Sequence, residues 1–415
     1  MAVVMTLEKL RETVAGSPVA IRGKAVLEPA GGCGDKVFPP THSVSDRVKE
    51  RGAKYAREER RSAGGEVERC VLLDSVQSQA NRMEEALEAL WAAKKITLPV
   101  ITVSMADVAP DVGVVTSLSA PHRIADALLR DSLLDGVLFR LSDLGKSFTD
   151  SSLRNAGPLF RVCPTGLLFG LWDSTGPKGG LGAKFARALV SEIVGFGAEF
   201  GVKTSSRIDP AGIVTKAAQI YQHQNPAEGW TTDVEQARRE KGAPMKRGDG
   251  RVSEVNHSNV PPTIDELAGG VTIDRAEQTV VLSLAALRRL SFGGGDIEAR
   301  TALAALGLLA ILAMDERGHD LRSRCLLVPR DGGALALSAI GKDGVAAPFE
   351  LDLEGAIALY EAAVAALPDA LRFKRGAAQL HPGETLAELQ PSEKLKHLVV
   401  RSRELAASGA EVEGT

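Results

Sequence analysis

The chain has 415 residues, of which 44% are hydrophobic and 25% are charged. This composition is typical of a folded globular protein and excludes disorder over the whole chain. Only 4% of residues are aromatic, so the sequence predicts an aliphatic core. The formal net charge of −3 excludes a generic polycation, and any binding to nucleic acid would need a local basic patch.

The first third of the chain predicts strands and helices separated by one long polar excursion. Asp74 and Ser75 are suited to cap a helix in which Met83 and Leu87 fall on one stripe. The predicted elements are, in order, a strand at 19–27, a polar excursion at 41–66, a strand at 67–73, a helix at 76–94, strands at 98–103 and 112–118, and a helix at 119–134.

The remainder of the chain is more irregular. A glycine-rich turn at 173–182 separates a strand-like apolar run from a stretch with helical spacing. The predicted elements are a strand at 159–172, a helix at 183–194, paired strands at 199–207 and 212–220, a second polar excursion at 225–262, a strand at 279–284, an apolar helix at 301–314, a hairpin of 324–328 with 334–340, and a helix at 353–367.

Strands and helices are mixed without a repeating βαβ order, so we predict an α+β fold. We expect one elaborated domain over residues 1–415. The excursions at 41–66 and 225–262 would be polar insertions into it, and residues 390–415 would form a polar, acidic tail.

Charge is distributed unevenly along the chain. Residues 140–251 hold 16 Lys and Arg against 11 Asp and Glu, whereas residues 343–415 hold 7 against 12. A basic centre suits a polyanion, although solvated helix faces give similar counts.

The sequence also predicts a compartment. Cys33, Cys70, Cys163 and Cys325 are widely spaced and form no CxxC pair, which favours reduced thiols in the cytoplasm. The apolar run at 301–314 is shorter than the roughly 20 residues that span a bilayer, so we expect a buried helix and no membrane contact.

The glycine-rich stretch at 176–184 is the sharpest local motif. Glycines let a phosphodiester approach the backbone closely, and the predicted helix after them would add its positive dipole end. Lys178, Lys184 and Arg187 supply matching charge. The stretch matches neither GxxxxGK[ST] nor GxGxxG, so a tight structural turn is the alternative interpretation.

A second polar cluster begins the predicted helix at 76–94. Gln77, Gln79, Asn81 and Arg82 place amide and guanidinium donors near a helix N-terminus, where they can bond phosphates, hydroxyls or base edges. The alternative is an ordinary polar first turn. Trp172, Tyr221 and Trp230 are suited to stack on bases or to pack in the core.

No catalytic constellation is recognisable. The seven histidines show no HExxH or paired spacing, and no GxSxG elbow occurs. The sequence therefore predicts no metal site, no cofactor and no enzyme activity.

Four stretches together resemble the backbone subunit (Cas seven type) of the type I-U, or I-G, CRISPR Cascade, within the RAMP superfamily. They are GKAVLEP at 23–29, GDKVFPPT at 34–41, VLLDSVQSQANRMEEAL at 71–87 and LFGLWDSTGPKGGLGAK at 168–184.

The resemblance implies an RRM-like (ferredoxin-like) palm with inserted finger and thumb elements. It also implies copies of the subunit arrayed along one crRNA, with target DNA read through the guide and with other Cascade subunits as partners. Either polar excursion would serve as the thumb. The motifs place on the RNA Lys24, Lys36, Gln77, Gln79, Asn81, Arg82, Lys178, Gly179, Gly180, Lys184 and Arg187, with Arg207 and Lys216 as further candidates.

Two rival functions follow from the same residues. A metal-dependent RNA nuclease or guide processor of the same superfamily would use Asp74 or Asp173, with His122. A phosphate-binding metabolic enzyme would use the turn at 176–184 and would bind mononucleotides tightly.

Overall fold

The computed structural model describes residues 3–43, 54–61, 64–173 and 183–407. Internal contacts divide the chain into two compact units. The first unit comprises Met1–His42, Tyr55–Glu199 and Val271–Leu395, and the second comprises Ser43–Lys54, Phe200–Gly270 and Lys396–Thr415. Helices and strands are mixed in the chain, so the predicted α+β class is confirmed. The RRM-like palm remains a prediction.

A ten-stranded sheet forms the frame of the first unit. Its central strands are antiparallel and long, and its edge strand β1 is parallel to β24. The order is β1 (Val3–Val4), β24 (Ala346–Glu350), β23 (Ala336–Ile340), β2 (Ala20–Pro29), β20 (Arg275–Ser283), β11 (Leu189–Phe196), β4 (Val67–Asp74) and β3 (Arg57–Arg61), with β22 (Cys325–Pro329) pairing with both β2 and β21 (His319–Arg322).

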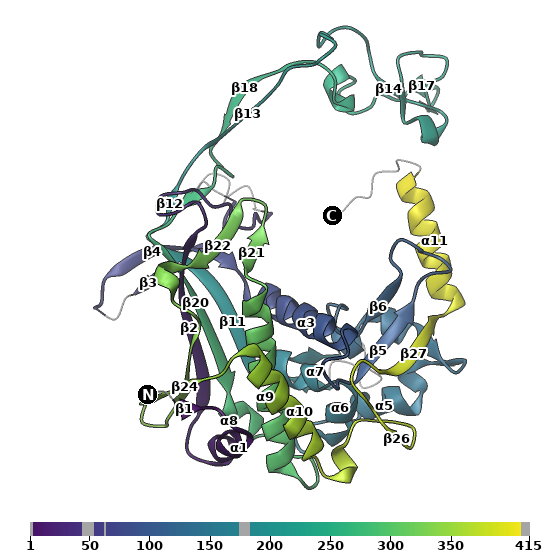
Figure 1. Ribbon diagram of the computed structural model, residues 1–415. Helices are drawn as coiled ribbons and strands as arrows, with labels where there is room; N and C mark the ends of the chain where they lie inside the picture. The colour runs from purple at the N-terminus through teal and green to yellow at the C-terminus, as the bar shows by residue number, and fades with distance from the viewer. Residues whose placement is uncertain (1–2, 44–53, 62–63, 174–182, 408–415) are drawn as a thin grey trace. The chain divides into compact units, whose positions relative to one another are not determined.

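Helices pack on one face of this sheet (Figure 1). Alternate residues of β2, such as Ile21 and Leu27, are buried on that face, whereas Lys24 and Val26 are exposed on the other. This period of two is the pattern of a half-buried strand. The helices of this layer are α1 (Leu7–Ala15), α3 (Val76–Ala92), α8 (Leu284–Leu287), α9 (Asp296–Glu316) and α10 (Leu353–Ala365).

Helix α9 is the core of this layer. It is long and apolar enough to cross a bilayer by composition alone, but 83% of its most apolar window is buried inside the protein. The helix packs against α1, α3 and α10. The prediction of a buried core helix is therefore confirmed, as expected for a soluble protein, while the cytoplasmic location stays a prediction. The four cysteines are free thiols.

A second, five-stranded sheet lies in the same unit, with short helices between its strands in the sequence. Its strands are β6 (Val114–Thr116), β5 (Val100–Ser104), β27 (Thr385–Pro391), β7 (Ser132–Leu134) and β8 (Val137–Leu138). The short helices are α4 (Ala127–Arg130), α5 (Asp143–Thr149), α6 (Gly157–Val162) and α7 (Pro164–Phe169).

On either side of the glycine-rich turn, the structure has helices where a strand was predicted and strands where a helix was predicted. The stretch at 159–172 is not a strand, because α6 and α7 occupy most of it and Pro164 begins α7. The stretch at 183–194 is not a helix but strand β10 (Lys184–Phe185) followed by β11. The positive dipole end expected after the turn is therefore absent.

Three further predictions are wrong in detail. Residues 212–220 form no strand, and β13 (Lys203–Arg207) pairs instead with β18 (Val260–Asp265). Strands β22 and β23 do not form a hairpin with each other, because both pair along β2. Of the helix predicted at 119–134, only one 3-10 turn and α4 form, and β7 follows them.

The second unit holds the polar excursion at 225–262. Its described strands are short pairs, and the loop after β13 is tied to the loop before β18 by hydrogen bonds to the buried Asp209. Burial disfavours the charged form of Asp209, but backbone hydrogen bonds from Ser258, Ala211 and Ile213 outweigh that cost and lower its pKa. Beyond β13 and β18, this unit contains β14 (Tyr221–Gln222), β15 (Trp230–Thr231), β16 (Arg239–Glu240), β17 (Ala243–Pro244) and most of α11 (Glu393–Ala407).

Candidate nucleic-acid interface

The first turns of α3 are anchored by a buried carboxylate. Asp74 is fully buried, and its Oδ2 accepts hydrogen bonds from Gln79 Nε2 (2.7 Å) and Arg82 Nε (3.0 Å). Its Oδ1 accepts a hydrogen bond from Arg322 Nη2 at 3.2 Å. The side-chain Oε1 of Gln79 accepts in turn a hydrogen bond from Ser191 Oγ at 2.7 Å. We call Asp74, Gln79, Arg82 and Arg322 the Asp74 cluster.

The Asp74 cluster divides the four polar residues of the α3 start into two pairs. Gln77 and Asn81, four residues apart, are exposed on one side of the helix. Gln79 is 1% exposed, and Arg82 also donates to the backbone oxygens of Asp320 and Leu321. Gln77 and Asn81 are thus available to a ligand, whereas Gln79 and Arg82 hold the helix start in place.

The glycine-rich stretch is bounded by a short antiparallel hairpin. Trp172 of β9 (Leu171–Trp172) pairs with Lys184 of β10. Beyond this pair, the Asp173 amide donates to the Ala183 oxygen at 3.1 Å, and Arg140 Nη2 lies 2.7 Å from Asp173 Oδ1. The hairpin therefore brings the two ends of the stretch together. Three predicted contact residues lie outside the described residues, namely Lys178, Gly179 and Gly180.

A buried ion pair supports the base of this hairpin. Arg123 donates from Nε and Nη2 to the two carboxylate oxygens of Glu84, both at 2.6 Å, and from Nη1 to the Gly170 oxygen at 3.1 Å. Gly170 has φ +88°, and a Cβ there would lie 3.0 Å from Arg187 Cγ. Burial raises the pKa of Glu84 to about 7, despite the opposing effect of Arg123. The buried Glu84–Arg123 ion pair therefore links helix α3 to the base of the hairpin.

The other predicted cations of the first unit lie at separate places. Lys184 and Arg187 are both exposed; Lys184 begins β10, and Arg187 lies two residues after its end. Lys24 is exposed on the sheet face opposite the helices, in register with Thr279 of β20. Lys36 is half-buried, in the turn that follows β2. The structure thus joins Lys184 and Arg187 at one hairpin but does not gather all the predicted cations.

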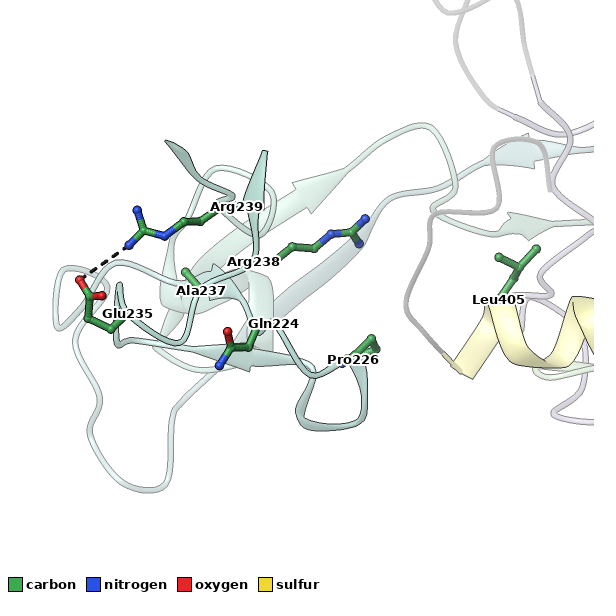
Figure 2. Close-up of a pocket in the computed structure, with 7 residues that line it drawn as sticks. All are labelled: Gln224, Pro226, Glu235, Ala237, Arg238, Arg239 and Leu405. Atoms are coloured by element: carbon green, nitrogen blue, oxygen red, sulfur yellow. Dashed lines mark ion pairs between the residues drawn. The ribbon is translucent and has the colours of Figure 1, made fainter. Parts of the chain in front are cut away.

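Arg207 and Lys216 belong to the second unit. Arg207 donates through Nε and Nη2 to the Ser258 oxygen at 3.2 and 3.0 Å, so it supports the end of the β13–β18 ribbon. Lys216 is exposed. Figure 2 shows a depression of the same unit in which Arg239 pairs with Glu235, 3.7 Å away, while Arg238 points away from that pair.

The sequence did not decide whether Trp172 packs in the core or stacks on a base, and the structure exposes it at the hairpin. Trp172 is 57% exposed, and the Lys184 ammonium lies 5.2 Å from the centre of its ring. The low aromatic content of the chain does not indicate whether a given tryptophan is exposed or buried. Lys184 lies beside Trp172 because β9 and β10 pair across the hairpin. The sequence pattern predicted a helix at 183–194, so it did not predict this pairing.

The carboxylates of the rival nuclease hypothesis have structural partners. Asp74 lies in the Asp74 cluster, and Asp173 is paired with Arg140. Within the described part of the chain, no group of three His, Cys, Asp or Glu side chains is arranged to hold a metal ion.

The comparison with protein families gives one match. The model of a family described as "CRISPR-associated protein GSU0053" matches residues 21–200, which include β2, α3 and the β9–β10 hairpin. No curated protein matches the sequence. By this match over residues 21–200, the chain is similar to CRISPR-associated proteins of the GSU0053 family, which implies a role in CRISPR defence.

Proposed function

We propose that the protein is a crRNA-binding backbone subunit of a type I CRISPR Cascade, built on an RRM-like palm. The observation that carries the proposal is the family match over residues 21–200. This segment contains every sequence-predicted RNA contact except Arg207 and Lys216. Copies of the subunit would line the guide, the guide would pair with target DNA, and other Cascade subunits would complete the assembly.

The chemistry required of such a subunit is modest. Guide pairing supplies the sequence specificity, so the protein needs contacts to phosphate and sugar rather than to base edges. Exposed cations and amides suit this task, and the first unit offers Lys24, Gln77, Asn81, Lys184 and Arg187. The half-buried Lys36 and the stretch with Lys178, Gly179 and Gly180 belong to the same proposal. The proposal assigns the protein no catalytic step.

Replacing Lys184 and Arg187 together with alanine is expected to weaken guide binding equally for all guide sequences. Each phosphate contact on a single strand contributes about 0.7 to the slope of log K against log salt, so the slope should fall by about 1.4. Filter binding at several salt concentrations measures both quantities. A matched control replaces Lys9 and Lys342, two exposed lysines at other places, and should leave the slope unchanged.

The rival nuclease function has a direct test. Labelled guide and target RNA are incubated with the protein, with and without divalent metal. Metal-dependent cleavage that is lost in an Asp74→Asn or Asp173→Asn variant shown to remain folded would replace the structural role with an enzymatic one.

A further inference from the structure

Trp172 stands out among the aromatic residues of the first unit. It is one of three tryptophans in the chain, and 57% of its surface is exposed. A tryptophan buries a large apolar area when it packs in a core, so leaving one exposed forgoes that stabilisation. On the same hairpin, Leu171 and Phe185 are only 5% and 4% exposed, so one face of the hairpin is buried and Trp172 lies on the other face, which is exposed.

The indole is held on a fixed frame. Leu171 and Phe185 pair across the hairpin, the buried Asp173 is bound to Arg140, and the preceding Gly170 oxygen is bound to Arg123. A ring on such a frame loses little conformational freedom when a planar ligand stacks on it, so the binding energy is not spent on ordering.

One cation lies over the ring, and a second follows close by in the sequence. The Lys184 ammonium lies 5.2 Å from the ring centroid, and the exposed Arg187 follows three residues later. An aromatic face beside positive charge matches a nucleotide, because the base stacks and its phosphate is neutralised. Trp230, in the second unit, differs: it is 39% exposed and makes an edge contact with His257.

We propose that Trp172 and Lys184 form a stacking platform for one nucleobase of the bound RNA. This inference rests on the proposed function and adds a contact to the base itself, beyond the sugar-phosphate contacts argued above. Stacking tolerates every base, so the platform would fix the position of one nucleotide without reading its identity.

The test compares Trp172→Ala with Trp172→Phe in the full chain. Trp172→Ala is expected to weaken binding of a guide RNA by about 5- to 150-fold, while Trp172→Phe retains most of the affinity. The salt slope should stay unchanged in both, because neither variant removes a charge. Unfolding curves of both variants check that the hairpin substitution leaves the protein folded.

An abasic scan of the guide then tests the base contact directly. One abasic position should weaken binding to the wild-type protein as much as Trp172→Ala does, and should weaken binding to Trp172→Ala no further. Quenching of tryptophan fluorescence by intact RNA should be smaller in the same variant.

The outcomes separate the two proposals. If the wild-type protein binds no RNA, the proposed function fails. If it binds RNA but folded Trp172→Ala binds equally well, the platform is wrong and the proposed function stands. If Trp172→Ala loses association with a protein subunit while RNA binding is unchanged, the exposed indole is a protein contact, and the platform is again overturned.

Discussion

Replacing Arg123 with methionine is expected to destabilise the protein by about 3–5 kcal/mol, because it leaves the Glu84 carboxylate buried without its partner. Glu84 and Arg123 are 2% and 8% exposed in their side chains, so water cannot replace the lost guanidinium. Methionine keeps much of the volume of arginine, which limits the contribution of a cavity. Urea unfolding at about pH 8, above the Glu84 pKa of about 7, measures the change in free energy.

The neighbouring ion pair on α3 provides the matched control. Arg317 lies 2.8 Å from Glu85, but the two side chains are 46% and 61% exposed. Arg317→Met should therefore cost less than about 1 kcal/mol. Equal losses for Arg123→Met and Arg317→Met would contradict the role assigned to desolvation.

The pH dependence of the Arg123 variant follows from the raised pKa of Glu84. The folded protein has a Glu84 pKa of about 7, above the ordinary 4.5, so it holds this proton more tightly than the unfolded chain does. The stability that Glu84 contributes is therefore present at low pH and lost as pH rises from about 4.5 to about 7. Without Arg123 the carboxylate is disfavoured further, so the cost of Arg123→Met should be larger at about pH 8 than at about pH 5.

The second large effect is expected at the Asp74 cluster. Asp74→Asn keeps the shape of the side chain but removes the negative charge that faces Arg82 and Arg322, and should cost about 2–3 kcal/mol. The estimate lies below that for Arg123 because the two arginine side chains are 29% and 27% exposed. Since the cluster fixes the start of α3, guide binding through Gln77 and Asn81 should weaken as well.

Asp369 offers a control at the surface, because it is also a carboxylate with two cationic partners. This carboxylate also faces two cations, Lys374 at 2.8 Å and Arg372 at 3.9 Å, but its side chain is 76% exposed. Asp369→Asn should change stability by less than about 1 kcal/mol and leave guide binding unchanged. Thermal unfolding and filter binding of both variants make the comparison, and similar losses in stability would contradict the importance of burial.

The sequence predicted correctly those elements whose hydrophobic pattern fits only a helix or only a strand. Helix α3 carries the stripe of Met83 and Leu87 after a capping serine, and Ser75 Oγ accepts a hydrogen bond from the Ser78 amide. Strand β2 alternates buried and exposed side chains. In both elements the local period and the burial in the fold agree.

The errors around the glycine-rich turn have a common physical cause. Short apolar segments that are buried nearly all round carry no period, so the helices α6 and α7 could not be distinguished from a strand. In β11, Leu189 and Ile193 are four residues apart, which fits a helix, but the strand places them on the same buried face with Ser191 between them. The β-branched Val190, Ile193 and Val194 were the better signal.

The candidate site was predictable in part. Gln79 stands four residues before Met83 and eight before Leu87, so the helical period already placed it on the buried stripe of α3. The opposite placement of Gln77 and Asn81 follows from the same period. No local pattern announces Arg322 or Arg123 as partners of α3, because each is more than 35 residues away in the sequence from the carboxylate it binds.

The most direct test of the proposed role is to purify the protein from cells that transcribe a CRISPR array and to identify the nucleic acid bound to it. We expect a repeat–spacer transcript of uniform length, with several copies of the protein arrayed along each RNA molecule in electron micrographs. A protein that emerges folded but without any guide transcript would contradict the proposal that it is a crRNA-binding backbone subunit.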